Sequence, residues 1–348
     1  MIYRSLIPLL AGTVLLLSAC GNNNNKQVEQ QHGKDTSHVA VDTISPKIKI
    51  YSDRLATNPK DADAYWNRGK LELLQKNLTT SFADLNQAVK LDSTKDGYYS
   101  SLADVDFLVG HTRDAKAAFE KCISLNPLNL DALLKLSEIY LDVRKYKDAE
   151  DLADRALKID KHQANAYFIK GLIFLEDKDT VKAASSMQTA IEQNPSFFNA
   201  YIQLGLIYSN KRSIHALDYF NTALNIQPNN VEPYYDKGMF YQQIGDYSTA
   251  MQTYQQALQI NPNYKSALYN MAYLFFINKD YNKSLDYFTK TINSDSTYTL
   301  AYYGRGECYE NLNDFTKAGR DYAHALKQNP DLDVAKEALA EVKAKMHK

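Results

Sequence analysis

Beyond residue 61, apolar residues recur along the chain with the spacing of helices rather than strands. Successive apolar positions lie alternately three and four residues apart, which places their side chains on one face of a helix. The runs come in pairs, and a proline or a polar turn usually follows the second run of a pair. This pattern predicts a series of paired helices.

Six of the nine prolines divide this part of the chain at regular intervals. Their spacings are 68, 68, 33, 34 and 68 residues, which are multiples of 34 with one single-residue deletion. Proline cannot continue a helix, so each marks the end of a second helix. The prolines are Pro59, Pro127, Pro195, Pro228, Pro262 and Pro330. Registering on Gly69 gives eight repeats: 62–95, 96–129, 130–163, 164–197, 198–230, 231–264, 265–298 and 299–332.

Two positions of the 34-residue repeat carry side chains of complementary size. Small residues let two helix axes approach closely, and larger residues opposite them fill the remaining space. Position 8 is small in every repeat: Gly69, Ala103, Ser137, Gly171, Gly205, Gly238, Ala272 and Gly306. Position 24 is mostly large: Leu85, Phe119, Ala153, Met187, Phe220, Tyr254, Phe288 and Tyr322. We therefore expect the first helix of each repeat to pack closely against the second.

The 34-residue period and these two positions resemble the tetratricopeptide repeat (TPR) family over residues 62–332. The resemblance implies an all-α fold, a right-handed TPR superhelix (α-solenoid) of eight helix-turn-helix repeats. Residues 46–61 and 333–348 are predicted to form terminal capping helices that cover the apolar flanks of the array. The chain departs from the family pattern at position 11 of repeats 1 and 2, where Glu72 and Asp106 replace an aromatic residue.

The resemblance also implies a binding surface, because the first helices of TPR repeats line the concave face. In repeats 1–3 the corresponding positions are mixed and charged, in repeat 4 they are apolar, and in repeats 5–8 tyrosine and amides dominate. Tyrosine offers apolar area with a polar tip, and amides pair with peptide backbone. An alternative is that some of these rings only pack against neighbouring helices. The expected partner-binding residues are Phe168, Leu172, Asn199, Gln203, Tyr235, Asp236, Tyr269, Asn270, Tyr273 and Tyr303.

The first 19 residues have the pattern of a signal peptide. A basic residue, Arg4, precedes a short apolar run that is too short to span a bilayer comfortably. The run ends in the sequence LSACG, which resembles a bacterial lipobox; such a signal is cut before Cys20, whose thiol then carries a lipid. Because Gly21 is not an Asp retention signal, the resemblance favours the outer membrane. No acidic cluster directly follows Cys20, which favours placing the repeats in the periplasm. The alternative is an ordinary cleavage site with an incidental cysteine.

Residues 20–45 are predicted to be a disordered tether that begins at the lipidated cysteine. The segment is rich in Asn and Gln and has too few large apolar residues to bury a core.

Charge and chemistry exclude several functions. The chain has 40 Lys and Arg residues and 41 Asp and Glu residues, so it has no excess of basic residues for binding nucleic acid electrostatically. Cys122 and Cys308 lie 186 positions apart, which favours buried core residues over a disulfide or a zinc site. The sequence has no recognisable catalytic motif, and the repeats leave no room for a catalytic domain. We expect neither enzymatic activity nor a cofactor or metal.

These observations predict a membrane-anchored TPR scaffold or adaptor. It would bind protein or peptide segments in its concave groove and support assembly of a bacterial envelope complex. The alternative is a glycan-binding envelope lipoprotein, because some lipoproteins of that class embed TPR units and use aromatic platforms. Such proteins carry long insertions between repeats, which this sequence lacks.

Overall fold

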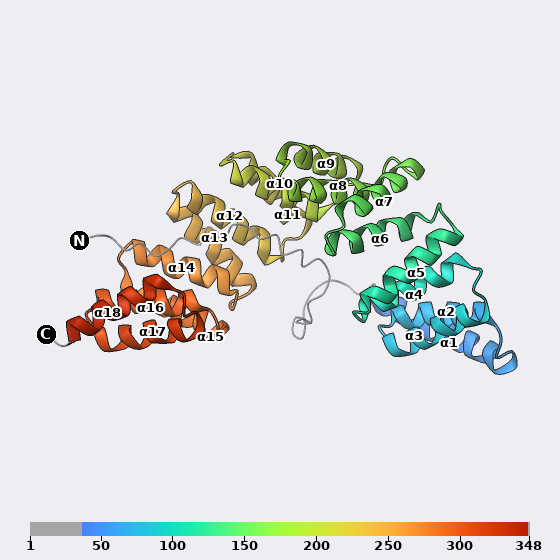
Figure 1. The fold of residues 1–348 in the computed structure, drawn as a ribbon, viewed down its shortest axis with the longest axis horizontal. Helices are drawn as coiled ribbons and strands as arrows, with labels where there is room; N and C mark the ends of the chain where they lie inside the picture. The colour runs from blue at the N-terminus through green and yellow to red at the C-terminus, as the bar shows by residue number, and fades with distance from the viewer. Residues whose placement is uncertain (1–36, 347–348) are drawn as a thin grey trace. The chain divides into compact units, whose positions relative to one another are not determined.

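The computed structural model describes residues 37–346, with side chains from residue 44 onward. Within this part of the chain the fold is all-α, with eighteen helices and no strand (Figure 1). The predicted signal peptide, the lipidation site Cys20 and the tether up to residue 36 lie outside the described residues. None of the described helices combines the length and apolar character needed to cross a membrane.

Each of the eight predicted repeats contains two helices of similar length, joined by a short turn. Their bounds are α2 (Ala62–Leu74) and α3 (Leu78–Leu91), α4 (Asp96–Leu108) and α5 (Thr112–Leu125), α6 (Leu130–Asp142) and α7 (Tyr146–Ile159), α8 (Ala164–Glu176) and α9 (Thr180–Gln193), α10 (Phe198–Asn210) and α11 (His215–Ile226), α12 (Val231–Gln243) and α13 (Tyr247–Ile260), α14 (Lys265–Ile277) and α15 (Tyr281–Ser294), and α16 (Thr299–Asn311) and α17 (Phe315–Gln328).

The described chain divides into two compact units, residues 37–194 and residues 195–346. The first unit contains α1–α9 and the second contains α10–α18. Within each unit every helix packs against the next one in the chain. The first helices of consecutive repeats also touch, as in the pairs α2 and α4, α6 and α8, α10 and α12, and α14 and α16.

The small residues at position 8 bring the two helices of a repeat together, as the sequence predicted. A Cβ atom added to Gly205 would lie 2.4 Å from the ring of Phe220, and one added to Gly238 would lie 2.5 Å from the ring of Tyr254. The aromatic ring of the second helix therefore packs directly on the backbone of the first. In repeats 5 and 6 this close packing places a large ring at the centre of the repeat.

The turn within each repeat uses the same backbone conformation at position 15. One residue there is left-handed, with φ between 52° and 85°, and it ends the first helix. The backbone N–H of the next residue closes the helix end; the N–H of Asn77, for example, donates to the carbonyl of Glu72 at 2.9 Å. The eight residues are Lys76, Gly110, Arg144, Lys178, Arg212, Gly245, Lys279 and Asn313.

The N-terminal helix differs from the prediction. We expected a tether over residues 20–45 and a capping helix over 46–61, but α1 spans Ser37–Thr57 and contains Pro46. An internal proline removes one backbone hydrogen bond and its ring crowds the carbonyl four residues earlier, which disfavours the helix, but α1 continues through Pro46 nonetheless. The tether prediction also gave too little weight to Val39 and Val41. The side chains of α1 and α2 meet where the Gln75 amide donates to Ser45 Oγ at 3.1 Å.

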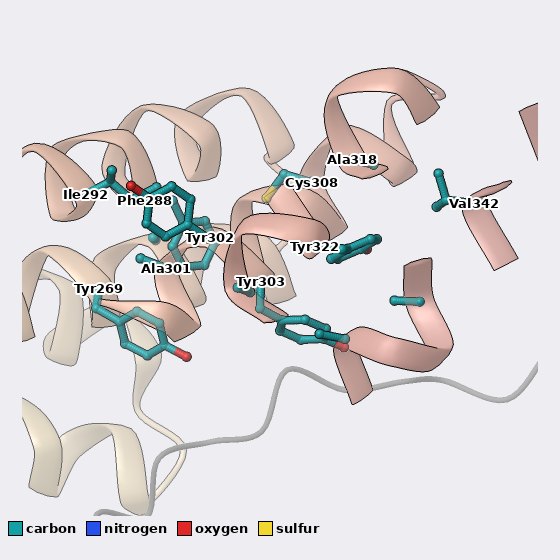
Figure 2. Close-up of a cluster of buried hydrophobic side chains, with 14 residues drawn as sticks. Tyr269, Phe288, Ile292, Ala301, Tyr302, Tyr303, Cys308, Ala318, Tyr322 and Val342 are labelled. Atoms are coloured by element: carbon teal, nitrogen blue, oxygen red, sulfur yellow. The ribbon is translucent and has the colours of Figure 1, made fainter. Parts of the chain in front are cut away.

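The C-terminal helix α18 (Asp333–Met346) packs on α17. Its buried face carries Ala335, Ala338 and Val342, which join a cluster that includes Ala318 and Tyr322 (Figure 2). Because α18 covers the side of the last repeat, it occupies the place expected of a cap.

Candidate binding surfaces on the first helices

The first unit has a pocket of about 320 Å³ between the first helices of repeats 1, 2 and 3. Leu108 at the pocket is 59% exposed, so apolar surface there faces water. The apolar lining consists of Leu73, Phe107, Leu108, Phe119 and Ile139. The charged lining consists of Asp104, Lys135 and Glu138. In the sequence, the corresponding positions of these repeats are mixed and charged, and none of them is among the expected binding residues.

Some charged side chains at this pocket form ion pairs and others do not. Lys135 Nζ contacts Asp104 Oδ1 at 2.7 Å and Asp131 Oδ2 at 2.8 Å. Burial raises the pKa of Asp104, although its hydrogen bond with Lys135 opposes the shift. Glu138 makes no hydrogen bond or ion pair within the described part of the chain, and desolvation followed by the charge of Asp142 raises its pKa. One cation thus faces an excess of carboxylates.

The second unit has a cluster of tyrosines around Asn270. The ring of Tyr235 lies 5.9 Å from that of Tyr254 and 5.4 Å from that of Tyr264, measured between centroids. Asn270 Nδ2 donates to Tyr254 Oη at 3.3 Å and to Tyr235 Oη at 3.4 Å. Burial raises the pKa of Tyr235 to about 12. The cluster is therefore a fixed set of neutral rings and hydroxyls.

Asp236 lies beside this cluster on α12. Its side chain is half-buried, and its Oδ2 atom is buried without a hydrogen-bond partner in the described structure. Burial raises the pKa of this carboxyl well above its usual value, and the charge of Glu232, one helical turn earlier, adds to the shift. A buried oxygen of this kind can accept a hydrogen bond from an N–H group that the chain itself does not supply.

The structure places the expected binding residues at different depths. Tyr269 is only 3% exposed, with its ring centroid 5.2 Å from that of Tyr298 and 5.7 Å from that of Phe288. The ring of Tyr303 packs against Tyr322 at 5.6 Å (Figure 2). The buried members are Leu172, Tyr269, Asn270 and Tyr303; the half-buried members are Phe168, Gln203, Tyr235, Asp236 and Tyr273; Asn199 is exposed. Phe168 and Leu172 belong to the first unit, and the other eight belong to the second.

The acids at position 11 of repeats 1 and 2 have a structural role that the sequence analysis missed. Asn77 donates to Glu72 Oε2 at 2.7 Å, and His111 Nδ1 lies 3.4 Å from Asp106 Oδ1. In both repeats the partner follows the acid by five residues, and this recurrence could have revealed the pairing. Asp114 lies near the second pair, so three potential metal ligands fall within 4.8 Å of one another. The same pairing in repeat 1 shows that a hydrogen bond is sufficient to hold the buried acid.

Comparison with known proteins identifies the repeats. A family model described as TPR repeat matches residues 238–278, and three described as tetratricopeptide repeat match residues 107–169, 219–252 and 299–332. The human protein O-mannosyl-transferase TMTC3 is 26% identical over 196 residues, which cover 55% of this chain and 21% of that protein. The human mitochondrial import receptor subunit TOM70 is 25% identical over 189 residues, covering 50% and 30%. The chain thus spans less than a third of these relatives.

Solved structures agree with the fold. The APC/C hetero-tetramer Cut9–Hcn1 aligns with a TM-score of 0.54 over 83% of this chain and 58% of that chain. The pilF protein of Pseudomonas aeruginosa aligns with a TM-score of 0.53 over 60% and 97%. Both are 16% identical to this chain, so the likeness concerns the fold alone. Repeats and relatives together support a protein–protein interaction scaffold with the expected all-α TPR superhelix. The chain is a tetratricopeptide repeat protein.

Proposed function

We propose that this chain is a membrane-anchored scaffold that reversibly binds segments of partner proteins and supports assembly of a bacterial envelope complex. Binding occurs on the first helices within each unit separately, on repeat 4 in the first unit and on repeats 5–8 in the second, and the chain acts without catalysis. Of the residues expected from the sequence, the accessible ones form the surface: Phe168 in the first unit, and Asn199, Gln203, Tyr235, Asp236 and Tyr273 in the second; Leu172, Tyr269, Asn270 and Tyr303 are buried and support it.

The unpaired oxygen of Asp236 is the observation that carries this proposal. A buried acceptor without a donor costs roughly 1–3 kcal/mol, so its presence in a stable fold favours a donor from outside the chain. A backbone N–H or a basic side chain of a partner supplies such a donor. The adjacent rings of Tyr235 and Tyr264 would cover the apolar part of the same segment.

Localisation follows from the sequence at the start of the chain. A lipid on Cys20 would hold the protein at the outer membrane with its repeats in the periplasm, and the anchor would restrict partner search to the membrane surface. The LSACG sequence and its preceding apolar run support this part of the proposal.

Crosslinking in native envelopes, followed by identification of the captured proteins, tests the binding surface. We expect Asp236→Asn combined with Tyr273→Ala to reduce partner recovery at least about fivefold, because the double variant removes a carboxyl group and a ring. Asp218→Asn is the matched control, since Asp218 is well exposed on a second helix of the same unit. Undiminished recovery with the double variant would show that partners bind elsewhere.

A further inference from the structure

We propose that the pocket between α2, α4 and α6 is a second binding site, for a partner segment in which one large apolar side chain adjoins a lysine or arginine. This inference rests on the proposed function, in that the occupant is a segment of a partner protein. It adds a site in the other unit, with a chemistry of its own.

The apolar lining defines the first half of the occupant. Phe107 and Leu108 come from the end of α4, Leu73 from α2 and Ile139 from α6, so three repeats contribute to one pocket. A volume of about 320 Å³ accommodates a large apolar side chain. Filling the pocket removes the exposed surface of Leu108 from water, which is favourable in proportion to the apolar area buried.

The charged rim defines the second half. Lys135 is already shared between Asp104 and Asp131. Glu138 and Asp142 lie one turn apart on α6, and neither forms an ion pair within the described residues. Like charges at this spacing destabilise a helix. Desolvation raises the pKa of both carboxyls, yet both residues are exposed, so a cation of a partner can reach them from solvent. A cation beside the apolar side chain relieves this repulsion.

Other occupants fit these charges poorly. An acidic segment would add to the repulsion between Glu138 and Asp142. A wholly apolar segment would cover the rim carboxylates without giving them a partner, and burying an unpaired charge is costly. A basic residue next to the apolar one satisfies both the lining and the rim.

Fluorescence anisotropy with the full chain tests the proposal. The probes are three labelled peptides with a common Gly/Ser background, which carry Leu-Lys, Leu-Glu or Ser-Lys at their centre. We expect the Leu-Lys probe to bind at least about threefold more tightly than the Leu-Glu probe, the range of an exposed ion pair. The margin over the Ser-Lys probe should be about tenfold, because one leucine side chain is buried. Equal binding of the three probes would refute the proposal.

Two variants locate the site. Glu138→Lys should reverse the preference between the Leu-Lys and Leu-Glu probes. Leu108→Asp should weaken the Leu-Lys probe about tenfold, whereas Leu128→Asp, at a residue 70% exposed in the same unit, should leave it unchanged. Circular dichroism melting confirms that each variant is folded.

An Asp236→Asn variant separates this proposal from the proposed function. The Leu-Lys probe should bind that variant as it binds the wild-type chain. If Asp236→Asn abolishes probe binding while Leu108→Asp and Glu138→Lys do not, the peptide binds in the second unit, and the pocket proposal fails while the proposed function stands.

Discussion

The guanidinium of Arg305 donates two hydrogen bonds to the carboxylate of Asp321, at 2.7 and 2.8 Å. Arg68 holds Asp84 in the same way, with both distances at 2.7 Å. Each arginine lies at position 7 of a first helix, and each aspartate lies at position 23 of the second helix of the same repeat. In the first and last repeats, the same bidentate salt bridge therefore joins the first helix to the second.

Asp321→Ala should destabilise the chain by about 3 kcal/mol, because it leaves the largely buried guanidinium of Arg305 without its partner. Urea unfolding of the purified protein measures the change. Asp286→Ala removes a carboxylate from an exposed pair with Lys290 and should cost less than about 1 kcal/mol. Equal losses for the two variants would show that the bidentate salt bridge has no special contribution.

Gly205→Ala should destabilise the chain, although alanine is normally the better helix former. The added methyl group would overlap the ring of Phe220, and such overpacking costs about 1–3 kcal/mol. Gly319→Ala provides the contrast, since its nearest neighbour would be 3.7 Å away and helix propensity should then add about 0.5–1 kcal/mol. Thermal melts of both variants check the signs; stabilisation by Gly205→Ala would contradict the packing described above.

Asp236→Asn should make the protein more stable at neutral pH while it weakens partner binding. The folded-state pKa of Asp236 is raised, so folding holds its proton more tightly than the unfolded chain does. Above the raised pKa the ionised carboxylate lowers the free energy of unfolding by its full amount. This loss of stability disappears as the pH falls below the pKa of Asp in the unfolded chain, about 3.9. The advantage of the variant should shrink over that interval. Urea titrations across pH measure it, and an advantage independent of pH would contradict the assignment.

Cys20→Ser should release the mature protein from membranes, because the serine hydroxyl does not accept the lipid that the lipobox prediction assigns to the thiol. Fractionation of cells that express the variant and the wild type shows the distribution. Cys122→Ser serves as a control for the loss of a cysteine, since Cys122 is buried in α5. Persistent membrane association of Cys20→Ser would overturn the lipid-anchor prediction.

Sequence spacing was sufficient to predict contacts within a repeat. Gly205 and Phe220 occupy positions whose side chains have complementary sizes, and the structure brings them together. Such contacts join two adjacent helices that a short turn connects. The residues of a single 34-residue repeat are therefore sufficient to predict them. The same holds for Gly238 and Tyr254.

The depth of the first-helix tyrosines was harder to predict. Tyr269 and Tyr303 occupy positions that line the concave face of TPR proteins, yet each is buried against rings of its own repeat. Their exposure depends on how these rings pack together in three dimensions, which no single position of the repeat encodes. The pocket at Leu108 was missed for a related reason: its apolar and charged residues come from three repeats and look unrelated when each repeat is read alone.

The left-handed residue in the turn of each repeat has an electrostatic consequence. Glycine adopts this conformation without strain, but only Gly110 and Gly245 use it, while Lys76, Arg144 and Lys178 are among the residues found elsewhere. Each of these positions follows the carboxyl end of a first helix, where the helix macrodipole is negative. A basic side chain there contributes about 0.3–1 kcal/mol, comparable with the roughly 1 kcal/mol of backbone strain. The dipole of the preceding helix thus offsets the strain of a turn that lacks glycine.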